Sequence, residues 1–198
     1  QGNARYWFRQ TDFAREMAEL KSAGARTRPP DQMLASMDSS RAGRVGCPFL
    51  PNEVVLTFDM DGPSHHVSLA VPTLVQDDLQ ASFFVPTAAI DHGGGVPSAD
   101  LRHIAKAGMR IGSHTERHFD MRYEHPDSMI ASLHRTQATL HALIVQQSTL
   151  ASAPGCRYHS QVLSGVIPAG FLAFFPSVRF SLPIELEPGG LSLLEFPG

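Results

Sequence analysis

Two aspartates are the first residues of this sequence that suggest chemistry. Asp59 and Asp61 follow an apolar and β-branched run at residues 54–58 and precede the turn-forming pair Gly62 and Pro63. Two carboxylates at the end of a buried strand are costly to desolvate unless a cation or a proton lies between them. The pair therefore indicates a cation site, although two aspartates that cap a turn and the next helix would explain the same spacing.

A histidine pair follows a second predicted strand. His114 and His118 are four residues apart and come directly after residues 109–113. This spacing can place two imidazoles on one face of a helical turn, around a single ion. Ten histidines in 198 residues would give about 0.5 such pairs by chance. Because the acidic turn and the histidine pair both follow strands of one predicted sheet, their joint position favours a shared site.

Together these side chains indicate hydrolysis assisted by a metal. Two histidines and one aspartate form a three-ligand set for a divalent metal with an open coordination position. A metal in such a site lowers the pKa of a bound water, so that hydroxide forms near neutral pH. The second aspartate can accept the proton of that water, provided that it is not itself a strong ligand.

Composition limits the other functional classes. The chain has 198 residues, of which 42% are hydrophobic and 18% charged, enough for one domain with a full core. A net charge of −3 gives no electrostatic reason to expect nucleic acid or an anionic membrane as a partner. The longest apolar run, near residues 166–175, is broken by Pro168 and Gly170 and is too short to span a bilayer.

The apolar spacing predicts strands that alternate with helices. Such alternation predicts parallel β/α units with right-handed crossovers and a site at the carboxyl ends of the strands. We expect an N-terminal preface of helices and loop at residues 1–50 and a catalytic domain at residues 51–198, packed as one unit. The predicted strands are residues 54–58, 81–86, 109–113, 156–158, 171–175 and 191–196, and the predicted helices are residues 5–22, 33–37, 67–79, 98–107, 126–147 and 161–169.

Several segments resemble the polysaccharide deacetylases, the NodB-homology enzymes of carbohydrate esterase family 4. Residues 57–62 (TFDMDG) resemble the TFDDG motif of that family, and residues 114–118 (HTERH) resemble its H[ST]xxH motif. Residues 81–85 (ASFFV) resemble its ATFFV strand, and residues 101–114 match its LRxIAxAGxxIGSH run. Residues 155–158 resemble the start of its third motif, and residues 13–26 resemble the preface of members that act on exported poly-N-acetylglucosamine.

The resemblance implies a fold and an activity. The fold would be α/β, a distorted (β/α) barrel of the NodB-homology type that is incomplete at the C-terminus. The chain would remove N-acetyl groups from an N-acetylglucosamine-containing polysaccharide, with water activated at a divalent metal, usually Zn²⁺, and a backbone N–H near Ser160 stabilising the oxyanion. The partner would be an N-acetylated glycan. The expected location is outside the cytoplasm, in the periplasm, at the cell surface or secreted, with the cytoplasm as the alternative.

The resemblance also implies roles for single residues. Asp59 would be the general base, and Arg157 would match the arginine that pairs with this base and keeps it ionised. Thr115 would brace the loop that carries both histidines. The implied metal ligands are Asp61, His114 and His118.

The sequence departs from the family pattern at several points. Met60 lengthens the aspartate pair to Asp-x-Asp, a form also found in branches that hydrolyse other amides and imides. After Arg157, Tyr158, His159 and Ser160 stand where the family has proline and tyrosine. The late Asp-Trp motif has no match, and neither has the final Leu-His motif, which supplies the catalytic acid. Either the C-terminal part of the barrel is missing, or the acid comes from elsewhere, for which His159 is a candidate and an ordinary loop histidine the alternative.

Other functions and other residues stay open on the sequence alone. The chain could hydrolyse a cyclic imide or ureide, or bind carbohydrate without catalysis, while an Fe(II) oxygenase would have no need of Asp59. His65 and His66 either line the substrate cleft or lie exposed at the start of a helix. Cys47 and Cys156 either form one disulfide or remain thiols, and they do not decide the compartment.

Overall fold

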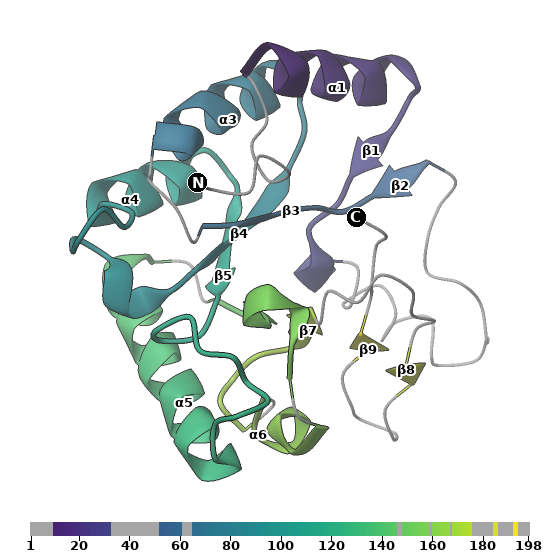
Figure 1. Ribbon diagram of the computed structural model, residues 1–198. Coiled ribbons are helices and arrows are strands. Elements are labelled where there is room, and N and C mark those ends of the chain that lie inside the picture. Colours follow the sequence, from purple (N-terminus) through teal and green to yellow (C-terminus); the bar gives the residue numbers. More distant parts are fainter. Residues whose placement is uncertain are drawn as a thin grey trace.

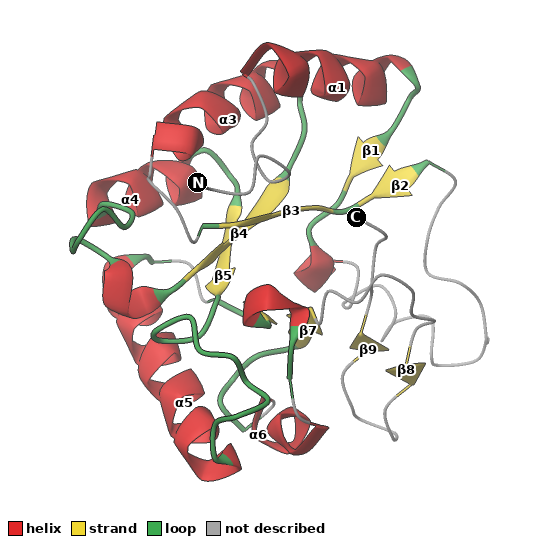
Figure 2. Cartoon of the chain, viewed as in Figure 1, coloured by secondary structure: helices red, strands yellow, loops and turns green. Residues whose placement is uncertain are grey.

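The computed structural model describes residues 10–32, 52–60, 65–145, 148–158, 160–166, 168–175, 184–185 and 192–193. The predicted helix at residues 33–37 and the side chain of Cys47 lie outside this part of the chain. Within it, the long helices lie along one side of a central group of strands (Figures 1 and 2).

Five parallel strands form the central sheet. They pair in chain order, each with the next, so that the sheet grows in one direction. This is the strand order of a (β/α) barrel, whereas a doubly wound sheet reverses its order at a switch point. The predicted α/β fold with a parallel sheet is confirmed. The strands are β3 (Leu56–Asp59), β4 (Ala81–Val85), β5 (Arg110–Ser113), β6 (Leu150–Ser152) and β7 (Ala173–Phe175).

Three long helices connect the strands and follow one another along the outside of the sheet (Figure 1). They are α3 (His65–Gln76), α4 (Ser98–Lys106) and α5 (Pro126–Leu143). The side chains of Met129, Leu133 and Leu140 on α5 recur at helical spacing and are buried. Helix α3 begins at residue 65, two residues before the predicted start, so that Pro72 lies inside the helix.

The sheet is strongly curled. Two strands, β4 and β5, separate β3 from β6, and neighbouring strands are about 4.8 Å apart, so a flat sheet would hold β3 and β6 roughly 14 Å apart. Ser152 at the end of β6 nevertheless donates a hydrogen bond to Asp59 at the end of β3, with 3.2 Å between Oγ and Oδ1. The carboxyl ends of the strands therefore converge, as the predicted distorted barrel requires.

The core is packed around the aromatic residues of the middle strands. All five side chains of β4 are buried, and the ring of Phe83 stacks on that of Phe58 with centroids 5.0 Å apart. Phe84 lies directly across from Gly112 of β5. The absence of a side chain at Gly112 leaves room for this ring, because a Cβ there would lie 2.5 Å from Phe84 Cδ1.

The N-terminal preface packs against the same core. Helix α1 (Gln10–Ser22) contributes the buried Met17, and its Phe13 ring contacts Phe58 edge to face, with centroids 5.9 Å apart. Strand β1 (Arg26–Thr27) then pairs in parallel with β2 (Glu53–Val54), the segment that leads into β3. The preface is thus joined to the sheet by a strand pair and an aromatic contact.

The C-terminal part differs from the sequence-based expectation. The fourth strand is β6, not residues 156–158, because Pro154 and Gly155 form a 3₁₀ turn, η3 (Pro154–Cys156). Tyr158 lies outside the named strands and forms an isolated parallel bridge with Met121. The helix predicted at residues 161–169 is shorter and consists of η4 (Ser160–Val162) and α6 (Leu163–Val166).

Strand β7 confirms the strand predicted at residues 171–175, and β9 lies within the segment predicted as a strand at residues 191–196. Strand β9 (Ser192–Leu193) pairs antiparallel with β8 (Ile184–Glu185). Among the described helices, none combines the length and the apolar character needed to cross a membrane.

The contact between Phe84 and Gly112 predicts a cost for any side chain at residue 112. A Cβ would also meet the carbonyl oxygen of Leu150 at 2.8 Å, and this backbone atom cannot move away without disturbing β6. We expect Gly112→Ala to lower the free energy of unfolding by about 1–3 kcal/mol, the usual cost of overpacking. Urea unfolding followed by circular dichroism measures this change.

Ser82→Ala is the matched control for this experiment. Ser82 is buried in β4, and its hydroxyl makes no hydrogen bond within the described part of the chain. Removing it adds no atoms and leaves no partner unsatisfied, so stability should change little. A Gly112→Ala variant as stable as this control would contradict the packing described here.

Candidate functional site

The site forms where β3, β5 and β6 end. Asp59 is the last residue of β3, His114 directly follows β5, and Ser152 is the last residue of β6. The His114 amide donates to the carbonyl oxygen of Val85 at 2.9 Å and so extends the pairing of β5 with β4. Because all these strands run in parallel, the three side chains lie at one edge of the sheet, as the sequence predicts for Asp59 and His114.

A short chain of contacts joins these three side chains. His114 is fully buried, and its Nδ1 lies 2.6 Å from Ser152 Oγ. Ser152 Oγ lies 3.2 Å from Asp59 Oδ1, whereas His114 Nδ1 is 3.7 Å from the same carboxylate oxygen. The Asp59 side chain is 42% exposed, so the chain of contacts runs from a buried imidazole to a carboxylate that solvent can reach.

His118 lies beside His114, with ring centroids 4.9 Å apart. The loop that brings them together has two residues in the left-handed region, Thr115 at φ +63° and His118 at φ +57°. A β-branched residue such as threonine adopts this conformation only at a cost of about 1–3 kcal/mol. The surrounding structure must therefore hold the loop in place.

Hydrogen bonds from two neighbouring elements hold this loop. The amides of Thr87 and Ala88, in η2 (Thr87–Ala89), donate to the carbonyl oxygens of Thr115 and Glu116 at 3.2 and 2.7 Å. On the other side, the Glu116 amide donates to Ser132 Oγ of α5 at 3.3 Å.

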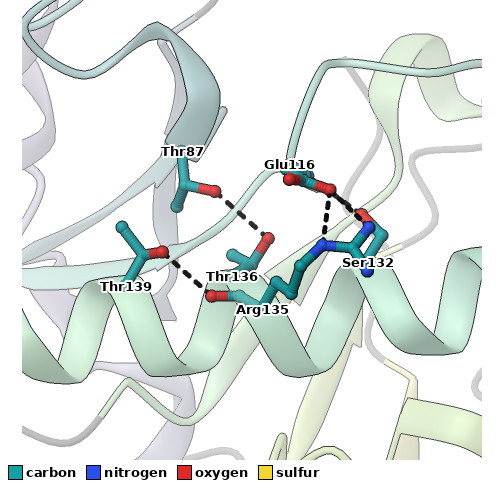
Figure 3. A network of polar contacts seen from close by, with 6 residues as sticks. All are labelled: Thr87, Glu116, Ser132, Arg135, Thr136 and Thr139. Carbon is teal, nitrogen blue, oxygen red and sulfur yellow. Dashed lines mark hydrogen bonds and ion pairs between the residues drawn. The ribbon is translucent and has the colours of Figure 1, made fainter.

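An ion pair ties the loop to α5 a second time (Figure 3). Glu116 Oε2 accepts from Arg135 at Nη2 (2.6 Å) and at Nε (3.1 Å). These hydrogen bonds hold the pKa of the Glu116 carboxyl below its usual value, because they stabilise its charged form. Nearby, the hydroxyls of Thr87 and Thr136 lie 3.2 Å apart and link η2 to α5. The loop is thus fixed by the elements that follow β4 and β5.

Thr115 supports the loop through its backbone. Its amide donates to Ser113 Oγ at 3.1 Å, and its carbonyl accepts from Thr87. Its hydroxyl is buried and makes no hydrogen bond with any described residue. The expected supporting role stays a prediction for the side chain.

The expectation that Arg157 pairs with Asp59 is wrong. Arg157 Nη1 lies 3.5 Å from Asp120 Oδ2, and the Arg157 side chain is 59% exposed. The bridge between Met121 and Tyr158 explains this, because it sets Arg157 beside Asp120. Asp120 also accepts hydrogen bonds from Arg122 at 2.7 and 3.0 Å, and these lower the pKa of its carboxyl to about 2. A catalytic role for Arg157 would require the arginine to leave this cluster.

Several predicted site residues lie outside the described part of the chain. Asp61 and His159 are among them, and so are the side chains of His65, His66 and Ser160. The backbone of His65 and His66 begins α3, and that of Ser160 begins η4. The roles proposed for these residues stay predictions, as does the pairing of Cys47 with Cys156.

The described donors fit part of a metal site. In this part of the chain, no group of three or more His, Cys, Asp or Glu side chains is arranged to hold an ion. The two neighbouring imidazoles of His114 and His118 are nevertheless suitable ligands for Zn²⁺, and the expected third ligand, Asp61, lies outside the described residues. Because Nδ1 of His114 is engaged by Ser152, its buried Nε2 would be the atom that binds a metal.

Sequence reasoning missed Ser152 and the support from α5. Ser152 belongs to the three-residue strand β6, in which two small residues follow Leu150, and so short a segment carries no periodic signal. Its position at a strand end would have been the only clue, since such ends form the site in β/α folds. Glu116 and Arg135 are far apart in sequence, and only the fold brings them together.

This arrangement defines a class of protein: a curled parallel β/α sheet that carries a carboxylate and a histidine pair at its carboxyl edge. The sequence profile of one family with these features, described as polysaccharide deacetylase, matches residues 48–173. The chain belongs to the polysaccharide deacetylase family, and the predicted resemblance is confirmed.

A curated relative supports this assignment. The Bacillus subtilis protein YxkH, whose name places it among the polysaccharide deacetylases, is 23% identical over 181 residues. The match covers 91% of this chain and 59% of the relative, so the chain spans less than two thirds of that protein's length.

Solved structures agree in fold. The structure of the Streptococcus pyogenes deacetylase PplD, determined in complex with acetate, superposes with a TM-score of 0.74 at 19% identity. The match covers 85% of this chain and 73% of the PplD chain. A pseudoenzyme of carbohydrate esterase family 4 from Bacillus anthracis superposes with a TM-score of 0.55 at 17% identity, over 61% of this chain and 41% of its own. At these identities the likeness shows a shared fold.

The ion pair between Glu116 and Arg135 predicts a pH-dependent contribution to stability. A carboxyl whose pKa is lowered in the folded state stabilises the fold above its unfolded pKa, near 4.5, and this contribution is lost as the pH falls through the lower folded value. Because Arg135 is 57% exposed, we expect Glu116→Gln to cost no more than about 1 kcal/mol at pH 7. The difference from wild type should vanish once the pH is below the folded pKa.

Urea unfolding across this pH range, with a chelator present so that no metal contributes, measures the effect. Glu19→Gln is the control, since it removes the same charge from an exposed position on α1. A difference between wild type and Glu116→Gln that stayed constant down to pH 3 would contradict the ion pair.

Proposed function

We propose that this protein is a metal-dependent hydrolase that removes N-acetyl groups from an N-acetylglucosamine-containing polysaccharide. The observation that carries the proposal is the meeting of Asp59, His114 and His118 at one edge of the curled sheet. Family membership supports the same activity.

In this proposal, His114, His118 and Asp61 hold a divalent ion, with Zn²⁺ the best fit to two imidazoles and a carboxylate. When bound, the ion supplies a Lewis acid and lowers the pKa of water. Asp59 acts as the general base, because its carboxylate is next to His114 and open to solvent. The water oxygen bonds to the carbonyl carbon while Asp59 accepts the water's proton. The amide C–N bond then breaks and the leaving nitrogen takes up a proton, so that the products are acetate and an amine on the sugar.

The relatives support the substrate class. The structure of PplD contains acetate, the product that the proposed reaction releases. The similarity of residues 13–26 to the preface of enzymes that act on exported glycans favours poly-N-acetylglucosamine and a location outside the cytoplasm. Hydrolysis of a cyclic imide or ureide is the alternative that Met60, between the two aspartates, favours. The pseudoenzyme relative makes carbohydrate binding without catalysis a third outcome to test.

Product analysis tests the proposal. Purified protein loaded with Zn²⁺ should release acetate from N-acetylglucosamine oligomers and should not open cyclic imide or ureide rings. Asp59→Asn should keep the metal but lower kcat by about 10²- to 10⁴-fold, the usual cost of losing a general base. Coupled detection of acetate and metal analysis of the same samples give both quantities.

Each other result has a definite meaning. Ring opening without acetate release would replace the proposed substrate by a cyclic amide. Glycan binding without either product would mean a non-catalytic relative. Loss of metal from Asp59→Asn would make Asp59 a ligand and would contradict its role as base.

A further inference from the structure

Ser152 holds a position that the proposed reaction does not yet explain. Ser152 is almost fully buried at the end of β6, between His114, an expected metal ligand, and Asp59, the proposed base. Its hydroxyl contacts both, at 2.6 Å from His114 Nδ1 and 3.2 Å from Asp59 Oδ1. At 3.7 Å, His114 and Asp59 are too far apart for a direct hydrogen bond, so Ser152 is the link between them.

The donors and acceptors of this link determine where its hydrogens lie. An ionised carboxylate can only accept, so the single hydroxyl hydrogen of Ser152 points to Asp59. The Ser152 oxygen then accepts from His114, and Nδ1 of His114 must carry a hydrogen. If the hydroxyl hydrogen of Ser152 pointed to His114 instead, the lone pairs of the Ser152 oxygen would face the oxygen of the Asp59 carboxylate, and the two would repel each other. A neutral His114 that donates through Nδ1 has its lone pair on Nε2.

We propose that Ser152 is a positioning residue that selects the Nδ1–H tautomer of His114 and thereby prepares Nε2 to bind the metal. Asp59 takes part through its charge, because it orients the hydroxyl. A partner that fixes the tautomer of a ligating histidine raises metal affinity, typically by about 10- to 100-fold. The effect of Ser152 on metal affinity rests on the proposed function, whereas the tautomer of His114 is a property of the metal-free protein.

The direct test is the tautomer of His114 in metal-free protein. Two-bond ¹H–¹⁵N correlation spectra at about pH 8, where an ordinary histidine is neutral, show which ring nitrogen carries the hydrogen. The His114 signal is assigned by its loss in His114→Gln. We expect Nδ1–H in the wild type and a shift toward Nε2–H in Ser152→Ala.

Zinc affinity is the second measurement, made by competition with a chromophoric chelator. Ser152→Ala should bind Zn²⁺ about 10- to 100-fold more weakly than wild type. The matched control is Ser82→Ala, which removes a buried hydroxyl from β4 that makes no hydrogen bond within the described residues. It should leave both the tautomer and the affinity unchanged.

Two results would overturn the proposal: a wild-type His114 that carries its hydrogen on Nε2, or a Ser152→Ala variant with unchanged tautomer and zinc affinity. The tautomer of wild-type His114 is measured without any variant, so this measurement tests the proposal even if Ser152→Ala fails to fold. A protein with the expected tautomer and zinc affinities that released no acetate would refute the deacetylase activity and leave this inference standing.

Discussion

The curvature of the central sheet is the constraint on which the site depends. Asp59 and Ser152 end strands that two other strands separate, yet their side chains form a hydrogen bond. A flat sheet would hold these ends roughly 14 Å apart, and the carboxylate would then be out of reach of the histidine pair. The close packing of Phe84 on Gly112 lies in the middle of this curled sheet, so the same core that stabilises the fold sets the geometry of the site.

The histidine loop shows how strain is held at the site. Thr115 and His118 both adopt left-handed backbone conformations, which are costly for residues other than glycine. Hydrogen bonds from η2 and from α5 offset this cost, and the ion pair between Glu116 and Arg135 adds to them. The loop is thus positioned by elements whose own sequences carry no catalytic motif.

The limits of sequence reasoning follow from the same geometry. Residues 54–58 and 81–85 are mostly apolar, β-branched or aromatic, so their strands and the position of Asp59 could be predicted. Residues 109–113 have only Met109 and Ile111 as large apolar side chains, and the strand there could be predicted because strands and helices alternate along the chain. Strand β6 has only three residues, two of them small, and its existence depends on pairing with β5 and β7. The partner of Arg157 depends on the bridge between Met121 and Tyr158, which no local pattern encodes.

X-ray absorption at the zinc edge of the reconstituted protein shows directly whether the strand ends form a histidine–carboxylate metal site. We expect one zinc per chain with two imidazole nitrogens at about 2.0–2.1 Å and oxygen in the remaining positions. In His114→Ala, one imidazole should disappear from this spectrum or the metal should be lost. A sulfur ligand at about 2.3 Å, or a spectrum without imidazole, would mean that the strand ends do not form this site.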